Sequence, residues 1–253
     1  MSKVFLDVSF LGTAYCGYQV QSGVPTVQQK LGEAARALFG VECDIVGCSR
    51  TDSGVHANHF CLTVTQKGKT FLHTTVPACR IPFAMSFYLP EDISVNSASF
   101  MDDDFHPRYD VKYKEYLYCI WNGSTRNPFM YDRSWHYARR ISDTELNNMR
   151  LAAEHLLGTH DFSAYMSANS SVKNTVRTLY NMSLEREGDM IYFRVRGDGF
   201  LYNMVRIIVG TLISVAEGKI QPMDICSITE AKDRRRAGIT APPQGLYLDK
   251  VVY

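Results

Sequence analysis

The sequence predicts an α+β protein made of two β-α-β-β-α-β halves. Segments of strand length, in which apolar and polar residues alternate, are separated by segments in which apolar residues recur at helical spacing. The same order of elements then occurs a second time along the chain. Such a repeat is typical of a duplicated ferredoxin-like arrangement, in which helices flank a largely antiparallel sheet. We therefore expect two ferredoxin-like halves that share one sheet.

The first half begins with a predicted half-buried strand at residues 3–10, where apolar residues occupy every second position. Thr26 and Gln29 form a capping-box pattern, which predicts a helix that ends at Gly40. The remaining elements of this half are two strands, a short helix and a closing strand, expected near 43–48, 57–66, 81–88 and 93–100.

The second half repeats this order from a predicted strand at residues 113–121. Ser142 and Glu145 form a second capping box, which predicts a helix ending at Gly158. Two strands, two helices and a closing strand are expected near 177–186, 190–197, 203–217, 222–231 and 246–252. The acidic run 102–104 is expected to mark the junction, so the predicted domains are residues 1–104 and 105–253.

The composition, with 253 residues of which 45% are hydrophobic and 21% charged, is that of a globular protein. There is no apolar run of membrane-spanning length and the N-terminus leads directly into a strand, so we expect neither an anchor nor a signal peptide. The seven cysteines are an odd number without a C-x-x-C pair, which favours free thiols in the cytoplasm over disulfides or a zinc site.

The net charge of +1 says little about partners, but the basic residues are unevenly distributed. Residues 105–140 carry seven Lys or Arg against three acids, with aromatic residues between them. This mixture suits phosphate contact and base stacking, and it also fits a solvated strand pair with ordinary aromatic packing. The basic run 232–236 is likewise open to two interpretations, an RNA contact or an exposed helix end.

The segment from Cys48 to Ala57 contains Arg50, Asp52, His56, a glycine and three hydroxyl side chains between two predicted strands. So many directional polar groups in a loop are typical of a functional site. Glycine lets the backbone approach a ligand, while arginine and aspartate supply charge. The alternative is an ordinary turn in which Asp52 caps backbone amides and Arg50 is solvated.

The predicted helix 203–217 is apolar almost all round, which indicates a buried helix. Arg206 is the one charged residue in its first turns. A guanidinium group in such a helix is costly unless a carboxylate or phosphate meets it, or unless the side chain reaches outward to solvent.

The run Arg50-Thr51-Asp52, followed by Gly54-Val55-His56-Ala57, resembles the catalytic loop of the TruA family of tRNA pseudouridine synthases. Further segments resemble the family's other motifs, in the family's order and over essentially the whole chain. They are residues 15–19 with 26–28, 105–108 with 114–116, 158–163, 200–210 and 242–248.

The resemblance implies an isomerase that converts uridine into pseudouridine in the tRNA anticodon stem-loop, at positions 38 to 40. It also implies a cytoplasmic homodimer with an active-site cleft between the two halves. Asp52 would be the catalytic carboxylate, and Arg206 would keep it ionised and in place. Tyr116 would stack on the flipped uracil or assist proton transfer at C5. No metal or organic cofactor is expected, because the isomerisation is redox-neutral.

Further substrate contacts follow from the same resemblance. Arg50 would fill the gap left by the flipped uridine or grip its phosphates, and His56 would contact RNA or only close the loop. Arg108 and Lys114 belong to the second motif and are expected to bind substrate. The chain departs from the family's usual pattern at Ser49 and Ser53, where Gly and Ala are frequent, and at Lys114, where Arg is frequent. The first exchange leaves open whether Ser49 needs a positive φ.

Three other functions compete with this interpretation. A hydrolase triad from Ser49 or Ser53 with His56 and Asp52 would have to align within one short loop, whereas triad residues come from distant parts of a chain. A metal site from His56, His59 and Asp52 lacks suitable spacing. A non-catalytic RNA-binding module is the serious alternative, because ferredoxin-like sheets bind RNA without chemistry.

Overall fold

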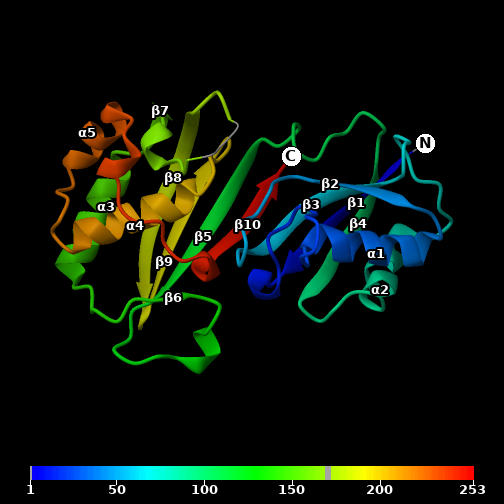
Figure 1. Ribbon diagram of the computed structural model, residues 1–253, viewed down its shortest axis with the longest axis horizontal. Helices are drawn as coiled ribbons and strands as arrows, with labels where there is room; N and C mark the ends of the chain where they lie inside the picture. The colour runs from blue at the N-terminus through cyan, green and yellow to red at the C-terminus, as the bar shows by residue number, and fades with distance from the viewer. Residues whose placement is uncertain (1, 169–171) are drawn as a thin grey trace. The chain divides into compact units, whose positions relative to one another are not determined.

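Strand β1 (Lys3–Phe10) organises the first of two packed units in the computed structural model, which describes residues 2–168 and 172–253 (Figure 1). Its side chains alternate between buried and half-buried positions, as predicted. Strands β4 (Ile93–Met101) and β3 (His56–Gln66) pair antiparallel with β1 on its two sides, and β2 (Cys43–Gly47) pairs antiparallel with β3. The strand order is therefore β4-β1-β3-β2.

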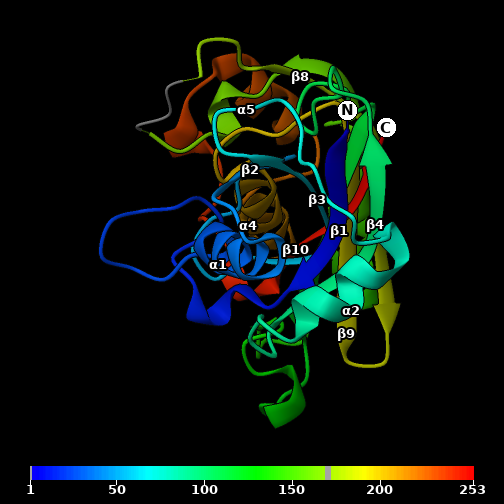
Figure 2. The ribbon, with the colours of Figure 1, turned by 90° about the vertical axis from the view of Figure 1, so that its right-hand side faces the viewer.

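Helices α1 (Val27–Phe39) and α2 (Ile81–Ser86) lie beside each other in this unit and pack against its strands (Figure 2). The hydroxyl of Thr26 accepts a hydrogen bond from the backbone N–H of Gln29 at 3.4 Å, as the capping pattern predicts. The Gln29 side chain bonds Glu33 instead of returning to the cap, so only half of the capping box forms. α1 ends at Gly40, whose φ of 70° is the left-handed conformation that glycine tolerates.

Strand β10 (Leu246–Val252) belongs to the first unit, which comprises residues up to Lys112 and Tyr247–Tyr253. The order of elements in the sequence had placed this strand in the second half. It pairs parallel with the start of β3, Tyr247 opposite His56, and the ring of Tyr253 contacts Phe5 at 5.6 Å between centroids. These contacts join residues 191 and 248 positions apart in the sequence, which no local pattern reveals.

The second unit, Tyr113–Leu246, has the antiparallel strand order β5-β9-β8-β7. The predicted strands appear as β5 (Tyr113–Trp121), β8 (Val176–Glu187) and β9 (Met190–Gly197). Two short strands were not predicted: β6 (Trp135–His136), which pairs parallel with β5, and β7 (Gly158–Asp161). Strands of two to four residues are too short to show an alternating pattern.

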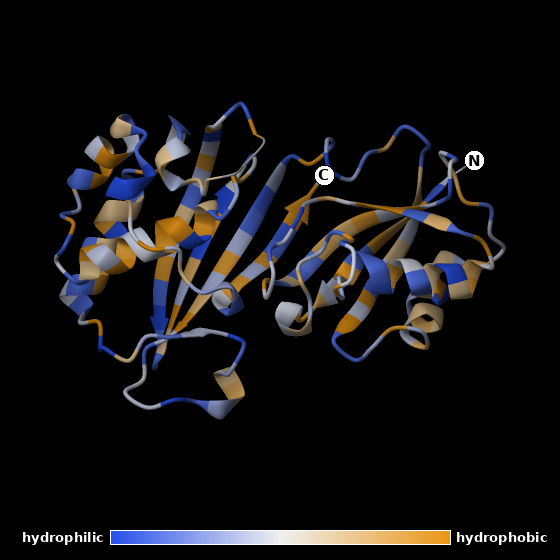
Figure 3. Ribbon diagram, in the orientation of Figure 1, coloured by the Kyte–Doolittle hydropathy of each residue, from blue (hydrophilic) through white to orange (hydrophobic). Residues whose placement is uncertain are grey.

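The helices of this unit are α3 (Asp143–Glu154), α4 (Met204–Ala216) and α5 (Asp224–Ala231). The Ser142–Glu145 capping box forms in full. α3 ends before the predicted Gly158, because that glycine, at φ 97°, already opens β7. α4 is buried on nearly every side, as its sequence predicts, and Figure 3 shows it apolar along most of its length.

The described chain is thus a mixed α+β protein with mainly antiparallel strand pairing. Short 3₁₀ turns connect its elements at Gly12–Ala14, Ala78–Arg80, Pro128–Met130, Ser163–Tyr165, Arg234–Arg236 and Pro243–Gly245. The seven cysteines all lie in the described part of the chain, and none of them forms a disulfide bond. Over residues 2–168 and 172–253, none of the helices has the length and apolar character needed to cross a membrane.

Candidate active site

Asp52 lies in the loop between β2 and β3, and residues 12–18 hold this loop through backbone hydrogen bonds. The N–H of Tyr18 donates to the carbonyl of Thr51 at 3.1 Å, and the N–H of Gly54 donates to the carbonyl of Tyr15 at 3.3 Å. The backbone is therefore tied on both sides of Asp52, which presents its half-buried carboxylate from a well-defined turn.

Gly17 allows these two segments to approach each other. Its φ is 87°, and a Cβ atom at this position would lie 2.5 Å from the carbonyl oxygen of Thr51. Both the backbone conformation and the close approach therefore require glycine. The same segment is anchored to the rest of the unit by Tyr15, whose hydroxyl donates to Asp92 at 2.6 Å. Burial and the Asp92 carboxylate raise the pKa of Tyr15, so it remains a donor.

His56 is fully buried at the end of the loop. Its Nδ1 accepts a hydrogen bond from the backbone N–H of Gly12 at 2.9 Å, and its ring lies 4.7 Å from the ring of Tyr247. Because Nδ1 is an acceptor, this bond requires that nitrogen to be unprotonated. The position supports the loop-closing alternative for His56, since a fully buried ring has no surface to offer to RNA.

The two serines that distinguish this loop fit its geometry. Apart from glycine, the described residues with positive φ are Asp132, Asn203 and Lys232, so Ser49 needs no left-handed conformation. The hydroxyl of Ser53 donates to the carbonyl of Tyr15 at 3.3 Å, which adds a side-chain contact between the two segments. Both exchanges thus leave the turn around Asp52 intact.

Arg50 and Arg108 expose their guanidinium groups, and no other described residue supplies these groups with a hydrogen bond or an ion pair. Arg108 follows His106, whose ring lies 4.2 Å from that of Tyr109. Lys114 lies on β5, opposite Gly197 of β9, and is half-buried. The two arginines therefore have the accessibility that an anion contact needs.

Tyr116 is presented by the middle of β5 and is only 7% exposed. Its ring meets Phe200 edge-to-face, with centroids 4.8 Å apart and an interplanar angle of 77°. Phe200 precedes α4, so this contact links the strand that carries Tyr116 to the turn that leads to Arg206.

Arg206 lies in the first turn of α4 and is half-buried. Its Nε donates to the carbonyl of Ala241 at 2.7 Å, and its Nη1 donates to the side-chain oxygen of Asn203 at 2.7 Å. These acceptors compensate part of the cost of placing a guanidinium in an apolar helix. The side chain therefore does not simply reach outward to solvent.

The acceptor at Ala241 is held by the segment that follows it. The hydroxyl of Tyr118 donates to the carbonyl of Pro242 at 2.7 Å. A Cβ atom on Gly245 would lie 2.6 Å from the Tyr118 ring, so this residue permits the close packing. The sequence analysis assigned no role to either residue: Tyr118 is an ordinary aromatic residue in a strand, and Asn203 lies within the motif at residues 200–210 but directly before a helix, where asparagine is common.

Comparison with known proteins identifies the family. Over all 253 residues, and covering 100% of both chains, the chain is 43% identical to the tRNA pseudouridine synthase A of Thermoanaerobacter sp. (strain X514). It is 40% identical over 252 residues to the Bacillus subtilis (strain 168) protein of the same name, covering 97% of each. A family model described as tRNA pseudouridine synthase matches residues 152–253.

The chain belongs to the TruA family of tRNA pseudouridine synthases. It is therefore an isomerase that converts uridine into pseudouridine in tRNA. A solved Cbf5-Nop10-Gar1 complex is also similar, with a TM-score of 0.38, 14% sequence identity, and coverage of 82% of this chain and 43% of that chain.

Several basic residues that composition suggested as RNA contacts of this synthase form ion pairs or hydrogen bonds with other residues of the chain. Arg139 forms an ion pair with Glu145 at 2.8 Å and donates to the carbonyl of Ala216. Arg140 forms an ion pair with Asp189. Both guanidinium groups already have a partner within the chain, and the expectation that these two arginines bind phosphate stays a prediction. In the run 232–236, Arg234 similarly donates to the carbonyl of Gly238 at 2.8 Å.

Asp161, within the motif at residues 158–163, clamps three segments of the second unit. It accepts hydrogen bonds from the hydroxyl of Thr175 at 2.6 Å and the N–H of Ser163 at 3.1 Å, and it pairs with Lys232 at 2.8 Å. Burial by itself raises the pKa of Asp161, but the bonds from these three residues lower it well below its ordinary value. Asp161 therefore holds Ser163, Thr175 and Lys232 together, which is a structural role.

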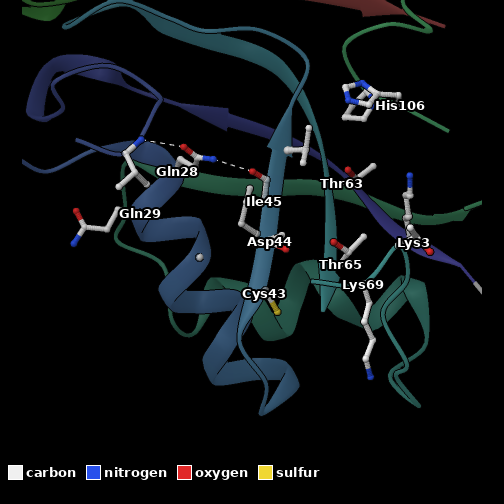
Figure 4. A pocket seen from close by; sticks show the side chains of 15 residues that line it. Lys3, Gln28, Gln29, Cys43, Asp44, Ile45, Thr63, Thr65, Lys69 and His106 are labelled. Carbon is white, nitrogen blue, oxygen red and sulfur yellow. Dashed lines mark hydrogen bonds between the residues drawn. The ribbon is translucent and has the colours of Figure 1, made fainter. Parts of the chain in front are cut away.

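The first unit also has a pocket of about 570 Å³, and no residue of the Asp52 loop lines it. Figure 4 shows the side chains that do. Its lining includes Lys3, Thr63 and Thr65, together with His106 of the second motif. Lys3 donates to the carbonyl of Phe105 at 2.8 Å, so this cation is already engaged. Among residues 2–168 and 172–253, no group of three or more His, Cys, Asp or Glu side chains could hold a metal ion.

Proposed function

We propose that this synthase modifies uridines at positions 38 to 40 of the tRNA anticodon stem-loop, with Asp52 as its catalytic carboxylate. The positions follow from the family resemblance. The observation that supports the role of Asp52 is its turn, which is tied to residues 12–18 by backbone hydrogen bonds on both sides. A reactive group needs such a fixed position, because small displacements of reacting atoms slow catalysis strongly.

In the proposed reaction, the ionised carboxylate of Asp52 acts as nucleophile or base on the bound uridine. The N1–C1′ bond breaks, the uracil rotates, and a C5–C1′ bond forms, while C5 loses a proton and N1 gains one. The atoms balance without any oxidant or cofactor. A uridine inside a stem must first leave the base stack to reach the carboxylate.

The other proposed roles belong to groups of both units. Arg206 would keep Asp52 ionised, supported by the hydrogen bonds that orient its guanidinium. Tyr116 would stack on the uracil or assist proton transfer at C5. Arg50, Arg108 and Lys114 would contact the RNA. The exposed guanidinium groups of the two arginines support this role. His56 would act as the residue that closes the loop.

We also propose that residues 1–104 and 105–253 are two ferredoxin-like halves. The order β4-β1-β3-β2, with antiparallel neighbours, supports this arrangement for the first half. By family resemblance, the protein would act as a cytoplasmic homodimer without a metal or organic cofactor.

The decisive test is to map pseudouridine by mass spectrometry in tRNA incubated with purified protein. We compare the wild type, Asp52→Asn and the charge-matched control Asp104→Asn, whose side chain is exposed. We expect Asp52→Asn to bind tRNA without modifying it and the control to remain active. Full activity in Asp52→Asn would refute the mechanism, and modification only outside positions 38 to 40 would refute the proposed specificity.

A further inference from the structure

Asn203, directly before α4, has a backbone conformation that is uncommon among residues other than glycine. Its φ of 61° and ψ of 8° are left-handed, a conformation it shares with Asp132 and Lys232 among the described residues other than glycine. It occupies the N-cap of α4, where an asparagine side chain ordinarily accepts a hydrogen bond from an N–H of the first turn. Here the side chain forms no such cap bond.

The side chain of Asn203 is instead directed to two other groups. Its Oδ1 accepts the hydrogen bond from Nη1 of Arg206 at 2.7 Å, and its Nδ2 donates to the hydroxyl of Ser167 at 2.9 Å. The backbone N–H of Ser167 in turn donates to the carbonyl of Tyr202 at 3.1 Å. Both ends of the Asn203 amide are thus used, and Ser167 is tied to the same turn.

These contacts determine the orientation of the Arg206 guanidinium. Nε is held by the carbonyl of Ala241 and Nη1 by Asn203, each at 2.7 Å. A planar guanidinium held at two of its nitrogen atoms cannot rotate about its side-chain bonds without breaking one of the two hydrogen bonds. Asn203 therefore supplies one of the contacts that define the plane of the guanidinium.

We infer that Asn203 is a positioning residue for Arg206 in the isomerisation, an inference that rests on the proposed role of Arg206. A neutral amide suits this task, since it orients the guanidinium without neutralising it. A carboxylate in its place would compete with Asp52 for the same positive charge. Asparagine also tolerates the left-handed backbone better than most residues, which explains why the turn can carry it.

The test uses Asn203→Gly, which keeps the left-handed backbone accessible and removes the amide. Asp132→Gly is the matched control, because it places glycine at another left-handed position, at φ 56°. Asn203→Asp keeps an acceptor for Arg206 but adds a negative charge. For each variant we measure the single-turnover rate on tRNA as a function of pH, tRNA affinity and thermal unfolding, with Arg206→Ala and Asp52→Asn as references.

We expect Asn203→Gly to lower the single-turnover rate by about 10- to 100-fold, with tRNA affinity unchanged. The acidic limb of its rate–pH profile should move to higher pH, because a misplaced guanidinium favours the ionised carboxylate less. Asp132→Gly should match the wild type. Asn203→Asp should also turn over more slowly, which provides a second measurement if Asn203→Gly does not fold.

An unchanged rate and pH profile in Asn203→Gly would overturn the inference, as would an equal decrease of the rate in Asp132→Gly. Wild-type turnover in Asn203→Asp would also contradict it. If these results came with inactive Arg206→Ala and Asp52→Asn, the proposed function would stand and only the positioning role would fail. Activity retained in both reference variants would instead refute the proposed function itself.

Discussion

The two units hold their candidate reactive groups by different means. In the first unit, backbone hydrogen bonds from residues 12–18 tie down the loop of Asp52, and Gly17 permits the approach. In the second unit, Arg206 is oriented through its own side-chain bonds, to the carbonyl of Ala241 and the amide of Asn203.

This difference predicts which substitutions should disturb the reactive group in each unit. Backbone bonds survive most side-chain substitutions, so the Asp52 loop should depend on glycine and on its reactive residues. The arrangement around Arg206 depends on its own side chain and on that of Asn203, so substitution of either residue removes a hydrogen bond outright. Interactions made through carboxylates also respond to pH, whereas backbone amides do not titrate in the range where proteins fold.

The largest expected effect is the loss of turnover in Arg206→Ala, which removes the oriented guanidinium. If Arg206 faces Asp52 as proposed, the double variant with Asp52→Asn should lose less stability than the two single changes summed, by roughly 0.5–3 kcal/mol. Denaturant unfolding of all four proteins measures this coupling. Simple additivity would show that the two groups do not interact.

Gly17→Ala tests the close backbone contact between residues 12–18 and the Asp52 loop in the first unit. Gly23→Ala is its matched control, because Gly23 has a similar φ of 80° but no atom within 4 Å of an added Cβ. We expect the control to lose about 1 kcal/mol of stability from its backbone conformation. Gly17→Ala should lose about 1–3 kcal/mol more from overpacking against Thr51.

Turnover separates the two glycine variants further. Gly17→Ala should slow isomerisation, because displacement of the Thr51 carbonyl shifts the neighbouring Asp52, while Gly23→Ala should retain the wild-type rate. Equal stabilities and rates in the two variants would show that the close approach at Gly17 contributes nothing to the loop.

Acid should weaken the hydrogen bonds and the ion pair that Asp161 forms in the second unit. Because hydrogen bonds lower the pKa of this carboxyl in the folded protein, its contribution to stability is present above its ordinary value of about 3.9. The contribution disappears as pH falls through the lowered folded-state pKa. Asp161→Asn should therefore be less stable than the wild type near neutral pH, and the difference should shrink in acid.

Thermal unfolding across the acid range measures this effect, with Asp104→Asn as the exposed control. A stability difference between Asp161→Asn and wild type that stayed constant down to strongly acidic pH would contradict the proposed clamp.

The smallest expected effects concern tRNA affinity. Arg50→Ala and Arg108→Ala remove exposed guanidinium groups, so each should flatten the salt dependence of tRNA binding by about one unit of slope for each phosphate that the variant no longer neutralises. Arg140→Ala removes a group paired with Asp189 and should leave the slope unchanged. A reduced slope in Arg140→Ala alone would place the RNA path over the second unit's ion pairs instead.

Local sequence patterns were sufficient to predict most elements of this fold. Alternation predicted β1 at its observed bounds, the strand predicted at residues 113–121 appears as β5, and continuous apolar character predicted α4 as a buried helix. The cap at Ser142 and the end of α1 at Gly40 were also predicted. Each of these features depends on residues within a few positions of one another, which is the range over which periodicity and capping operate.

The candidate site could be proposed from motif residues such as Asp52 and Arg206, but their surroundings could not. Only the tertiary structure shows that His56 is buried against Gly12, that Arg139 and Arg140 are engaged in ion pairs, and that Asn203 bonds Arg206. It also assigns β10 to the first unit. Burial and pairing depend on residues far apart in sequence, so they are decided when the chain packs and not by any local pattern.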